Sequence, residues 1–466
     1  MATLAFLGAT KQVTGSCYLI ETGEYRLLLE CGIRQGADQR DDEGEQPFKF
    51  DPRTIDSVII SHTHLDHSGM VPLLVNDGYD GPIYTTSATQ DLLPIMYRDA
   101  ASLILSDYER KNRRLLRAGK DPETPPYDME DVEQALQLIV GIDYGIKQQV
   151  CPAIQLRFRD AGHVLGSAIV ELWIETKESN RKLVFSGDLG NDCAPLLSDP
   201  EEITEADILL LESTYGERNH RPLSETLEEF KQVIETAANE GGNILIPSFA
   251  VGRTQDLIYW LGQLKREGSL DNHTVYIDSP MAIKVSDVYS RHQHLFNDDD
   301  PDFRQFIKHG WDNWLPGLVY TPTPEESMEL NTINDGAIII AGSGMCTGGR
   351  ILHHLKHNLW LPNTHVVIVG YQAQGTLGRA LVDGISQVKI YGEEISVKAK
   401  IHTLGGFSAH AGQDQLIRWA NNFQPKHPQL FLIHGEPEAI EALQQRLSRQ
   451  YQWDAYIPSL GEVITL

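Results

Sequence analysis

Two patterns of hydrophobic and polar positions divide the chain. In roughly the first 210 residues, short apolar runs such as residues 25–30 and 57–61 end in polar, glycine-containing loops. Such runs predict β-strands whose following loops are available for chemistry. From about Glu212 onward, apolar runs, glycine-containing turns and amphipathic helical segments alternate instead. That alternation predicts a parallel sheet with helices packed on it.

The alternating region contains repeated units of strand, turn and helix, at residues 243–261, 274–285, 337–355 and 366–382. After about Ile390 the strand-like, histidine-bearing pattern of the first region returns, and the sequence ends in the strand-like GEVITL. We therefore expect an inserted α/β domain that interrupts another domain. The expected segments are residues 1–208 and 391–466 for the interrupted domain and 209–390 for the insertion.

One further segment, residues 99–141, has a helical pattern of hydrophobic and polar positions. Near its middle lies a cluster of basic side chains: Arg110, Lys111, Arg113, Arg114 and Arg117. A charge run of this kind is typical of a solvated helix face, and we interpret it as one.

Composition limits the classes of protein to consider. The 39 basic and 65 acidic side chains give a net charge of −26 with histidines neutral. Proteins that hold nucleic acid mainly through nonspecific phosphate contacts carry the opposite sign, so any nucleic acid must bind through a local patch and through bound metal cations. The five scattered cysteines contain no CxxC pair and fit a reducing cytoplasm. Without a membrane-length apolar run or a leader pattern, we expect a cytoplasmic protein and no membrane partner.

The densest chemical signal is SHTHLDHSG, residues 61–69, directly after the buried-strand pattern IDSVII. His62 and His64 are two positions apart, so an extended backbone points both imidazoles to the same side, toward one metal ion. Asp66 and His67 lie at the start of the following turn, where they can reach a second ion. Imidazole and carboxylate without thiolate form the ligand set of catalytic zinc or of a similar first-row metal.

Two other strand ends offer further ligands. The segment DAGHVLGSAIVEL places His163 in a glycine-flanked turn between two apolar strands, and LVFSGDLGN ends a strand at Asp188. A single histidine or aspartate in a turn is more often a cap or a surface group. Because both residues follow the first motif in this order, they become candidate ligands of the same centre.

These motifs in this order resemble the metallo-β-lactamase superfamily, and the rest of the chain resembles its β-CASP nucleases, which include the endonuclease subunit of the pre-mRNA cleavage and polyadenylation factor. The resemblance covers nearly the whole chain. It implies an α/β protein, with a four-layer αββα metallo-β-lactamase fold and an inserted α/β β-CASP domain. It also implies two Zn2+ ions per chain, although Mn2+ or Fe2+ suits the same ligands.

The resemblance assigns seven metal ligands, of which the last, His434, follows a strand in FLIHGEPEA. His62, His64 and His163 hold one ion, Asp66, His67 and His434 hold the other, and Asp188 bridges both. One position departs from the family pattern, because LLLECG places Glu30 where the family usually has an aspartate behind the metal ligands. The extra methylene shifts the orientation of a ligand histidine, so we expect a reduced or retuned rate.

Two further β-CASP motifs indicate acid–base chemistry: ILLLESTYG ends a strand at Glu212, and GGFSAHAG presents His410. Phosphodiester hydrolysis needs a proton for the departing oxygen, and we expect His410 to donate it, kept protonated by Glu212. The alternative is that these two residues form a purely structural pair. Asp66 is the third expected catalytic residue, beside a metal-activated water. In the family, a histidine at the position of His434 is typical of members that process RNA.

The inserted domain is expected to bind the substrate, because its glycine-rich turns offer backbone N–H groups and arginines to phosphate. The candidate residues are Ser248, Arg253, Gly344, Arg350 and Arg379. None of these turns matches a P-loop, so we expect no nucleotide cofactor.

The sequence therefore predicts a zinc-dependent ribonuclease whose partner is RNA, expected to be single-stranded, and it leaves a homodimer open. One alternative is a hydrolase of a small ester, thioester or lactam; the long insertion and His410 argue against it, because a small substrate requires neither. Another alternative is a non-catalytic RNA-binding subunit, against which the complete ligand set argues. The choice between endonuclease and exonuclease stays open.

Overall fold

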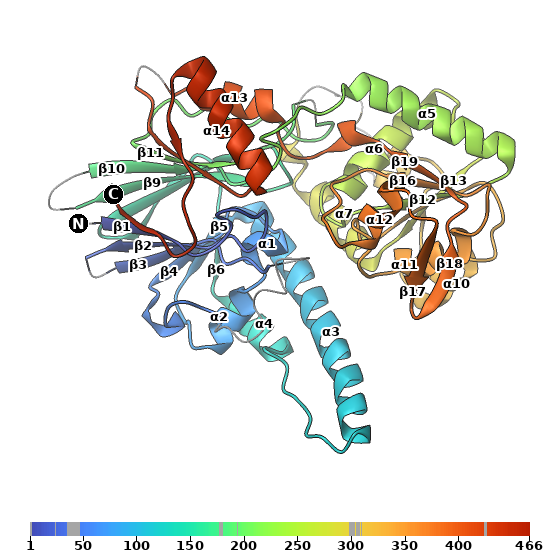
Figure 1. Cartoon of the computed structure of the whole chain (residues 1–466), viewed down its shortest axis with the longest axis horizontal. Helices are drawn as coiled ribbons and strands as arrows, with labels where there is room; N and C mark the ends of the chain where they lie inside the picture. The colour runs from blue at the N-terminus through green and yellow to red at the C-terminus, as the bar shows by residue number, and fades with distance from the viewer. Residues whose placement is uncertain are drawn as a thin grey trace. The chain divides into compact units, whose positions relative to one another are not determined.

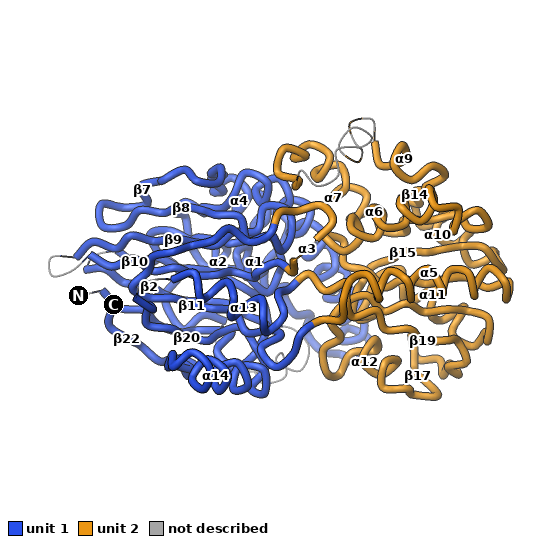
Figure 2. Tube along the Cα trace, turned by 90° about the horizontal axis from the view of Figure 1, so that it is seen from above, with its two compact units in different colours: residues 1–190, 199–219, 410–466 blue, residues 191–198, 220–409 orange. Residues whose placement is uncertain are grey.

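The computed structural model describes residues 2–23, 25–34, 47–176, 180–192, 194–297, 303, 308, 310–423 and 426–466. The chain forms two compact units (Figure 2). Unit 1 comprises Met1–Gly190, Asp199–Asn219 and His410–Leu466, and unit 2 comprises Asn191–Ser198 and His220–Ala409. Compared with the division expected from the sequence, residues 209–219 group with unit 1, and residues 191–198 and 391–409 group with unit 2.

Unit 1 contains two seven-stranded sheets. The first has the order β22 (Val463–Thr465), β1 (Ala2–Phe6), β2 (Tyr18–Thr22), β3 (Tyr25–Leu29), β4 (Ser57–Ile59), β5 (Ile83–Thr86) and β6 (Ile139–Ile142). Strands β22, β1, β2 and β3 pair antiparallel, and β3 to β6 pair parallel. The strand-like GEVITL at the C-terminus thus adds β22 to the edge of β1.

The second sheet has the order β21 (Ala455–Tyr456), β20 (Gln429–Ile433), β11 (Ile208–Glu212), β10 (Asn180–Phe185), β9 (Ala168–Glu175), β8 (Ile154–Asp160) and β7 (Lys147–Cys151). Strands β7 to β10 form an antiparallel meander, whereas β10, β11, β20 and β21 are parallel. Parallel neighbours end at the same edge of a sheet, so the loops after β10, β11 and β20 lie together.

The main core of unit 1 lies between the two sheets. Alternate residues of each strand face it, because successive side chains of a strand point to opposite faces. Leu4 and Leu29 of the first sheet pack with Leu156, Val170 and Leu210 of the second, and all five are buried. Burial of this apolar area is the main stabilising contribution to the unit.

Helices cover the outer faces of both sheets (Figure 1). The first sheet packs against α2 (Val71–Asn76), α3 (Ser87–Arg117) and α4 (Met129–Gln137), and the second against α13 (Gln413–Ala420) and α14 (Pro437–Tyr451). The short helices η2 (Pro52–Thr54) and α1 (Leu65–Ser68) complete the unit. Unit 1 therefore has the four-layer αββα architecture that the sequence predicted.

The helical pattern expected over residues 99–141 is confirmed only in part, because the segment contains the end of α3, a loop, α4 and the start of β6. Helix α3 begins earlier, at Ser87, where the Thr86 side chain accepts the Thr89 N–H. It ends at Arg117, and Gly119 in the left-handed region (φ 69°) and Pro122 prevent its continuation. A new helix, α4, starts after a capping box at Asp128, and the expected segment ends in strand β6.

Unit 2 contains a six-stranded parallel sheet. Its order is β14 (Val319–Tyr320), β13 (Thr274–Asp278), β15 (Ala337–Ala341), β12 (Ile244–Pro247), β16 (His365–Ile368) and β19 (Lys400–Thr403). Strands β17 (Gln387–Ile390) and β18 (Glu393–Ser396) form a separate hairpin. Every pairing in the larger sheet is parallel, which confirms the sequence prediction.

The four units of strand, turn and helix expected in this region are present. They are β12 with α6 (Arg253–Arg266), β13 with α7 (Pro280–Arg291), β15 with α11 (Ile351–Asn358), and β16 with α12 (Leu377–Val382). The remaining helices are α5 (Leu223–Glu240), η3 (Gln293–Leu295), α9 (Trp311–Trp314), α10 (Pro324–Leu330) and η4 (Gly405–Phe407). Among the residues that the structure describes, no helix combines the length and apolar character that a membrane span requires.

A buried carboxylate, Asp278, stabilises the end of β13 in unit 2. Its oxygens accept hydrogen bonds from Thr321 (2.8 Å) and Ser327 (2.6 Å). They also contact the Arg350 guanidinium (2.7 Å) and His354 Nε2 (2.6 Å). Burial by itself raises the pKa of this carboxyl, but the hydrogen bonds outweigh burial and hold the pKa at about 2.

Replacing Asp278 by Ala is expected to lower the free energy of unfolding of unit 2 by about 3–5 kcal/mol, because Arg350 and His354 lose a buried anionic partner. The pKa of Asp278 is depressed, so its contribution is present above about pH 4 and is lost as the pH falls toward about 2. Urea unfolding of both proteins between pH 7 and pH 2 measures this difference. Asp278→Asn, which keeps the shape, should cost less; equal stability of Asp278→Ala and wild type at pH 7 would contradict the assignment.

Candidate metal centre and active site

The histidine and aspartate candidates of unit 1 lie in loops that follow strand ends. His62 and His64 follow β4, and Asp66 and His67 are in α1, directly after them. The other candidates follow strands of the second sheet: His163 lies between β8 and β9, Asp188 after β10, and His434 after β20. The two sheets thus bring seven residues, separated by up to 372 positions in the sequence, to one place.

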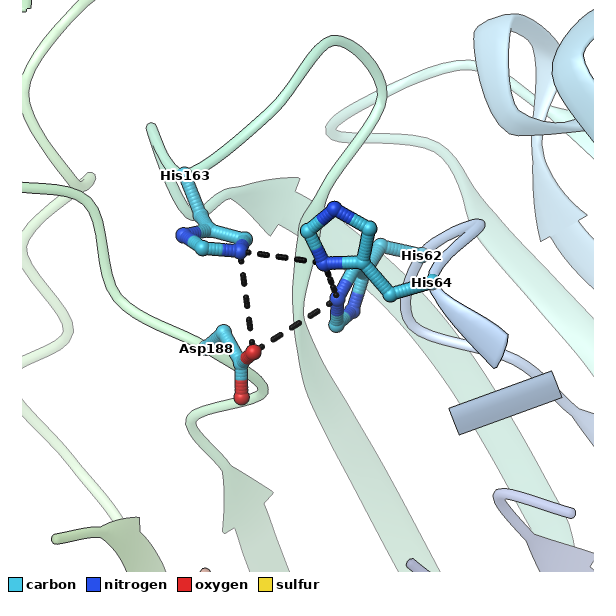
Figure 3. Close-up of side chains that lie close together, drawn as sticks. All are labelled: His62, His64, His163 and Asp188. Atoms are coloured by element: carbon cyan, nitrogen blue, oxygen red, sulfur yellow. Dashed lines mark hydrogen bonds and ion pairs between the residues drawn. The ribbon is translucent and has the colours of Figure 1, made fainter. Parts of the chain in front are cut away.

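Four of these residues form a first cluster (Figure 3). His64 Nδ1 lies 3.1 Å from His62 Nε2 and 3.3 Å from His163 Nε2. Asp188 Oδ2 is 3.6 Å from each of those two Nε2 atoms. Figure 3 shows the three imidazoles and the carboxylate pointing toward one another.

A second cluster contains Asp66, His67 and His434. His67 Nε2 lies 3.2 Å from His434 Nε2, and Asp66 Oδ2 is 3.9 Å and 3.7 Å from these two atoms. The other oxygen of Asp188, Oδ1, is 3.3 Å from His67 Nε2. Asp188 therefore turns one carboxylate oxygen to each cluster, which is the arrangement of a bridging ligand.

The spacing of these atoms fits metal coordination. Zinc binds imidazole nitrogen and carboxylate oxygen at about 2.0–2.2 Å in a tetrahedron, which places neighbouring ligand atoms about 3.4 Å apart. The observed distances in the first cluster run from 3.1 to 3.6 Å. Hydrogen bonding alone accounts for them poorly, because each neutral imidazole has only one N–H and three ring nitrogens face one another here. A cation accepts all of their lone pairs at once.

Three side chains behind the clusters orient the imidazoles. Glu30, fully buried, contacts His67 Nδ1 through Oε2 and accepts the Ser61 N–H (2.6 Å) and hydroxyl (2.9 Å). Ser61 Oγ also lies 3.0 Å from His62 Nδ1, and Thr214 Oγ1 lies 3.1 Å from His434 Nδ1. The contacts to His62 and His67 engage Nδ1, so Nε2 of each ring is directed at the metal position. His434 Nδ1, by contrast, also lies 3.5 Å from Asp188 Oδ1.

Two of these orienting residues, Ser61 and Thr214, were missed by the sequence reasoning. Each lies within two positions of a residue that it did single out, since Ser61 precedes His62 and Thr214 comes two positions after Glu212. The available signal was a hydroxyl residue beside a candidate ligand, which is too common to be selective. The contact of Glu30 with His67 agrees with the expected position behind the ligands, and its effect on rate stays a prediction.

Burial and neighbouring charges set the ionisation of the clusters. Burial lowers the pKa of both His62 and His64, which keeps these imidazoles neutral and able to donate lone pairs. Burial raises the pKa of Asp66, but His67 and His434 outweigh it and hold the pKa at about 2. The pKa of Asp188 is well below its ordinary value for the same reason: the surrounding histidines outweigh burial. Both carboxylates are thus anionic at neutral pH.

His410 and Glu212 lie beside the first cluster. Glu212, buried at the end of β11, accepts the Leu189 N–H (2.7 Å) and places Oε1 3.5 Å from His410 Nδ1. The His410 ring centroid is 4.4 Å from that of His163, and its side chain is 20% exposed. Burial alone lowers the pKa of His410, but the Glu212 and Asp188 carboxylates raise it to about 9. His410 is thus a protonated imidazole next to the candidate metal positions.

The candidate substrate-binding residues lie in unit 2, where most of their side chains contact other residues of the same unit. Ser248 is buried and shares a hydrogen bond with Thr254, and a side chain at Gly344 would collide with the Phe249 ring. Arg253 begins α6, Arg350 precedes α11 and Arg379 lies in α12, and each of the three contacts a carboxylate. Arg253 Nη1 lies 3.1 Å from Asp256, Arg350 Nη1 lies 2.7 Å from Asp278, and Arg379 Nε lies 3.0 Å from Asp383. Their binding of substrate stays a prediction.

The four-layer unit and its histidine–aspartate cluster define a hydrolase of the metallo-β-lactamase class. Sequence models of three families match the chain: the metallo-β-lactamase superfamily at residues 10–147, the Beta-Casp domain at residues 254–381, and the Zn-dependent metallo-hydrolase RNA specificity domain at residues 394–458. The chain belongs to the β-CASP ribonuclease family, as the resemblance indicated.

Curated relatives and a solved structure agree with this family. Ribonuclease TTHA0252 of Thermus thermophilus is 40% identical over 446 residues, which cover 96% of each chain. Transcription termination factor FttA of Methanocaldococcus jannaschii is 30% identical over 465 residues, or 98% of this chain and 70% of that protein. The crystal structure of a protein of unknown function from Enterococcus faecalis covers the whole chain with a TM-score of 0.54 at 14% identity, which shows the fold alone.

Proposed function

We propose that this protein is a metal-dependent ribonuclease that hydrolyses RNA phosphodiester bonds at the two clusters of unit 1. The observation that carries the proposal is the position of Asp188, whose two oxygens face different sets of imidazoles. Two Zn2+ ions fit these ligands, and Mn2+ or Fe2+ suits the same atoms. When bound, such ions supply a water of lowered pKa and stabilise negative charge on the phosphate.

The residues of the chain supply the remaining steps. Asp66 is the ligand carboxylate most open to solvent, with 23% of its side chain exposed, and is suited to orient the water that attacks phosphorus. His410, protonated beside Glu212, donates its proton to the departing ribose oxygen. Because water is partly excluded at this depth, the charge of the imidazolium also stabilises the phosphate more strongly than it would in bulk solvent.

Replacing Glu212 by Gln is expected to shift the alkaline limb of the kcat pH profile to lower pH by about one unit. The reason is that loss of the Glu212 charge removes the largest influence that raises the pKa of His410. RNA cleavage rates between pH 6 and pH 10 measure the shift. Glu225→Gln, on the exposed surface of α5, is the matched control. An unmoved alkaline limb in Glu212→Gln would assign Glu212 and His410 to the structural pair considered above.

RNA is the substrate class that the observations favour. The family model at the C-terminal end describes an RNA specificity domain, and the most similar curated relatives include a protein named ribonuclease. A hydrolase of small esters or lactams has no need of unit 2, and a non-catalytic subunit has no need of seven intact ligands. We further propose that the RNA is bound as a single strand, that the arginines of unit 2 contact its phosphates, and that the protein acts in the cytoplasm. Self-association as a homodimer remains open.

The experiment that tests the function uses purified protein and end-labelled RNA, with and without chelator, while bound metal is counted per chain. Cleavage that requires about two ions per chain and is restored by added Zn2+ supports the proposal. A chromogenic lactam and a thioester serve as the comparison substrates. Turnover of either small substrate without cleavage of RNA would replace the proposal by the small-molecule hydrolase.

A further inference from the structure

Helix α3 of unit 1 continues well beyond the core on which it packs. Its buried side chains end with Leu93, Tyr97 and Ala101, spaced four residues apart along one face. From residue 102 to residue 126, a segment that the structure describes throughout, no residue is buried. Figure 1 shows this part of α3 projecting away from α2 and α4, with the following loop at its tip. We call residues 102–126 the arm.

Polar contacts join the loop of the arm to its helix. Asn112 Nδ2 donates to the carbonyl of Glu123 (2.8 Å), and the Glu123 N–H donates back to Asn112 Oδ1 (2.8 Å). Lys111 forms an ion pair with the Glu123 side chain. These contacts tie the returning loop to the helix, and Pro122, Pro125 and Pro126 reduce the freedom of that loop further. The helix therefore presents a fixed surface to solvent.

The charge of the arm differs in sign from that of the whole chain. Between residues 110 and 120 there are six basic side chains and no acidic one, in a protein of net charge −26. Arg110 pairs with Asp107 and Lys111 with Glu123, but no carboxylate among the described residues forms an ion pair with Arg113, Arg114 or Arg117. Positions 110, 113, 114 and 117 recur at helical spacing, so these arginines share one face along about 10 Å of helix.

A solvated helix face, our interpretation from the sequence alone, does not explain this arrangement. Solubility is already provided by the acidic surface, and concentrating positive charge costs repulsion within the helix. Beyond Ala101 the apolar side chains of α3 are at most half-buried, so they repay little of the ordering of its backbone. Arg113, Arg114 and Arg117 are exposed and form no ion pair with a described carboxylate, so their guanidinium groups are available to bind phosphate.

We propose that the arm is an accessory RNA-binding element that contacts the phosphate backbone, without regard to sequence, outside the metal centre. This inference rests on the proposed function, since RNA is the polyanion that a ribonuclease must hold. An acidic protein partner is less suited to the surface, because protein interfaces are built around clustered apolar or aromatic side chains. The strongly exposed apolar residues of the arm, Leu103 (59%) and Leu116 (60%), lie far apart on the helix.

The test compares RNA binding by full-length chains that carry Asp66→Ala to prevent cleavage. In the arm variant, Arg113, Arg114 and Arg117 are all replaced by Gln. The matched control replaces three exposed arginines of unit 1 elsewhere, Arg53, Arg181 and Arg449, so that it loses the same charge. Fluorescence anisotropy with labelled RNAs of about 8 and about 40 nucleotides gives the affinities at several salt concentrations. Circular dichroism checks that α3 remains helical.

For the longer RNA, the arm variant should bind roughly ten-fold more weakly at 0.1 M salt. Its plot of log affinity against log salt concentration should have a slope smaller by about 2, because each phosphate contact to a single strand contributes about 0.7. The loss should be smaller for the short RNA. Replacing the same arginines by Lys should restore the slope, because Lys keeps the charge.

Equal affinities and slopes for the arm variant and the control variant would overturn the proposal. The proposal would also be overturned if the arm variant changed self-association in sedimentation velocity without a change in RNA affinity. That result would assign the arm to a contact between proteins. The chain with Asp66 intact is assayed for RNA cleavage in parallel. If this chain neither cleaves nor binds RNA, the proposed function and the arm proposal both fail. If it cleaves and binds RNA but the arm variant binds RNA as well as the chain without arm substitutions does, only the arm proposal fails.

Discussion

Replacing Asp188 by Ala is expected to reduce RNA cleavage by at least about 10⁴-fold in kcat/KM and to release bound metal. Asp188 is the only candidate ligand among the described residues that turns one oxygen to each cluster, so its loss weakens both metal positions at once. It also removes the carboxylate oxygen that lies 3.3 Å from His67 Nε2 and 3.5 Å from His434 Nδ1, which leaves Asp66 as the one carboxylate of the second cluster. Metal analysis by mass spectrometry and cleavage of end-labelled RNA measure the two effects.

The control for this experiment is Asp188→Asn, which preserves volume but removes the negative charge. It should lose metal as well, because an amide oxygen is a weaker ligand than a carboxylate and does not neutralise two cations. Ser61→Ala should have a smaller effect, roughly 10- to 100-fold, because the Ser61 hydroxyl contacts His62 and Glu30 but is not itself a candidate ligand. Full metal content and wild-type cleavage in Asp188→Ala would show that the bridging arrangement is not the metal centre.

Replacing His410 by Ala is expected to lower kcat for RNA by about 10²- to 10⁴-fold while both metal ions stay bound. His410 contacts the Glu212 and Asp188 carboxylates but stands outside both groups of candidate ligands. Its loss should therefore remove the proton donor and not the activated water. The effect should shrink for a phosphodiester with a p-nitrophenol leaving group, which departs without needing a proton.

The matched control for the loss of a histidine is His294→Ala, an exposed residue of unit 2. It should cleave RNA at the wild-type rate. A His410→Ala protein that keeps its kcat would contradict the role of general acid. If the same protein instead lost its metal, His410 would have to be counted among the ligands.

The group of candidate metal ligands and the alternation of strands and helices in unit 2 were predictable, because short stretches of sequence carry the signals for both. Four potential ligands within residues 62–67 and repeated strand–turn–helix units are visible in short windows of sequence. The extent of α3 was not, because its start depends on a hydrogen bond from the Thr89 N–H to the Thr86 side chain and its end on the left-handed backbone of Gly119, and neither Thr nor Gly marks a helix limit uniquely. Contacts between residues far apart in the sequence were not predictable either, as Arg350 shows. Its pairing with Asp278 joins residues 72 positions apart, and only the folded sheet brings them into contact.

The wide separation of the ligands has a consequence for biosynthesis. The strand before His434, β20, pairs in parallel with β11, so the second cluster cannot close until more than 430 residues have emerged from the ribosome. Strand β22, which seals the edge of β1, follows later still. We therefore expect a growing polypeptide to leave RNA uncut, the messenger that encodes it included, until the segment that carries His434 has been synthesised and β20 has paired with β11.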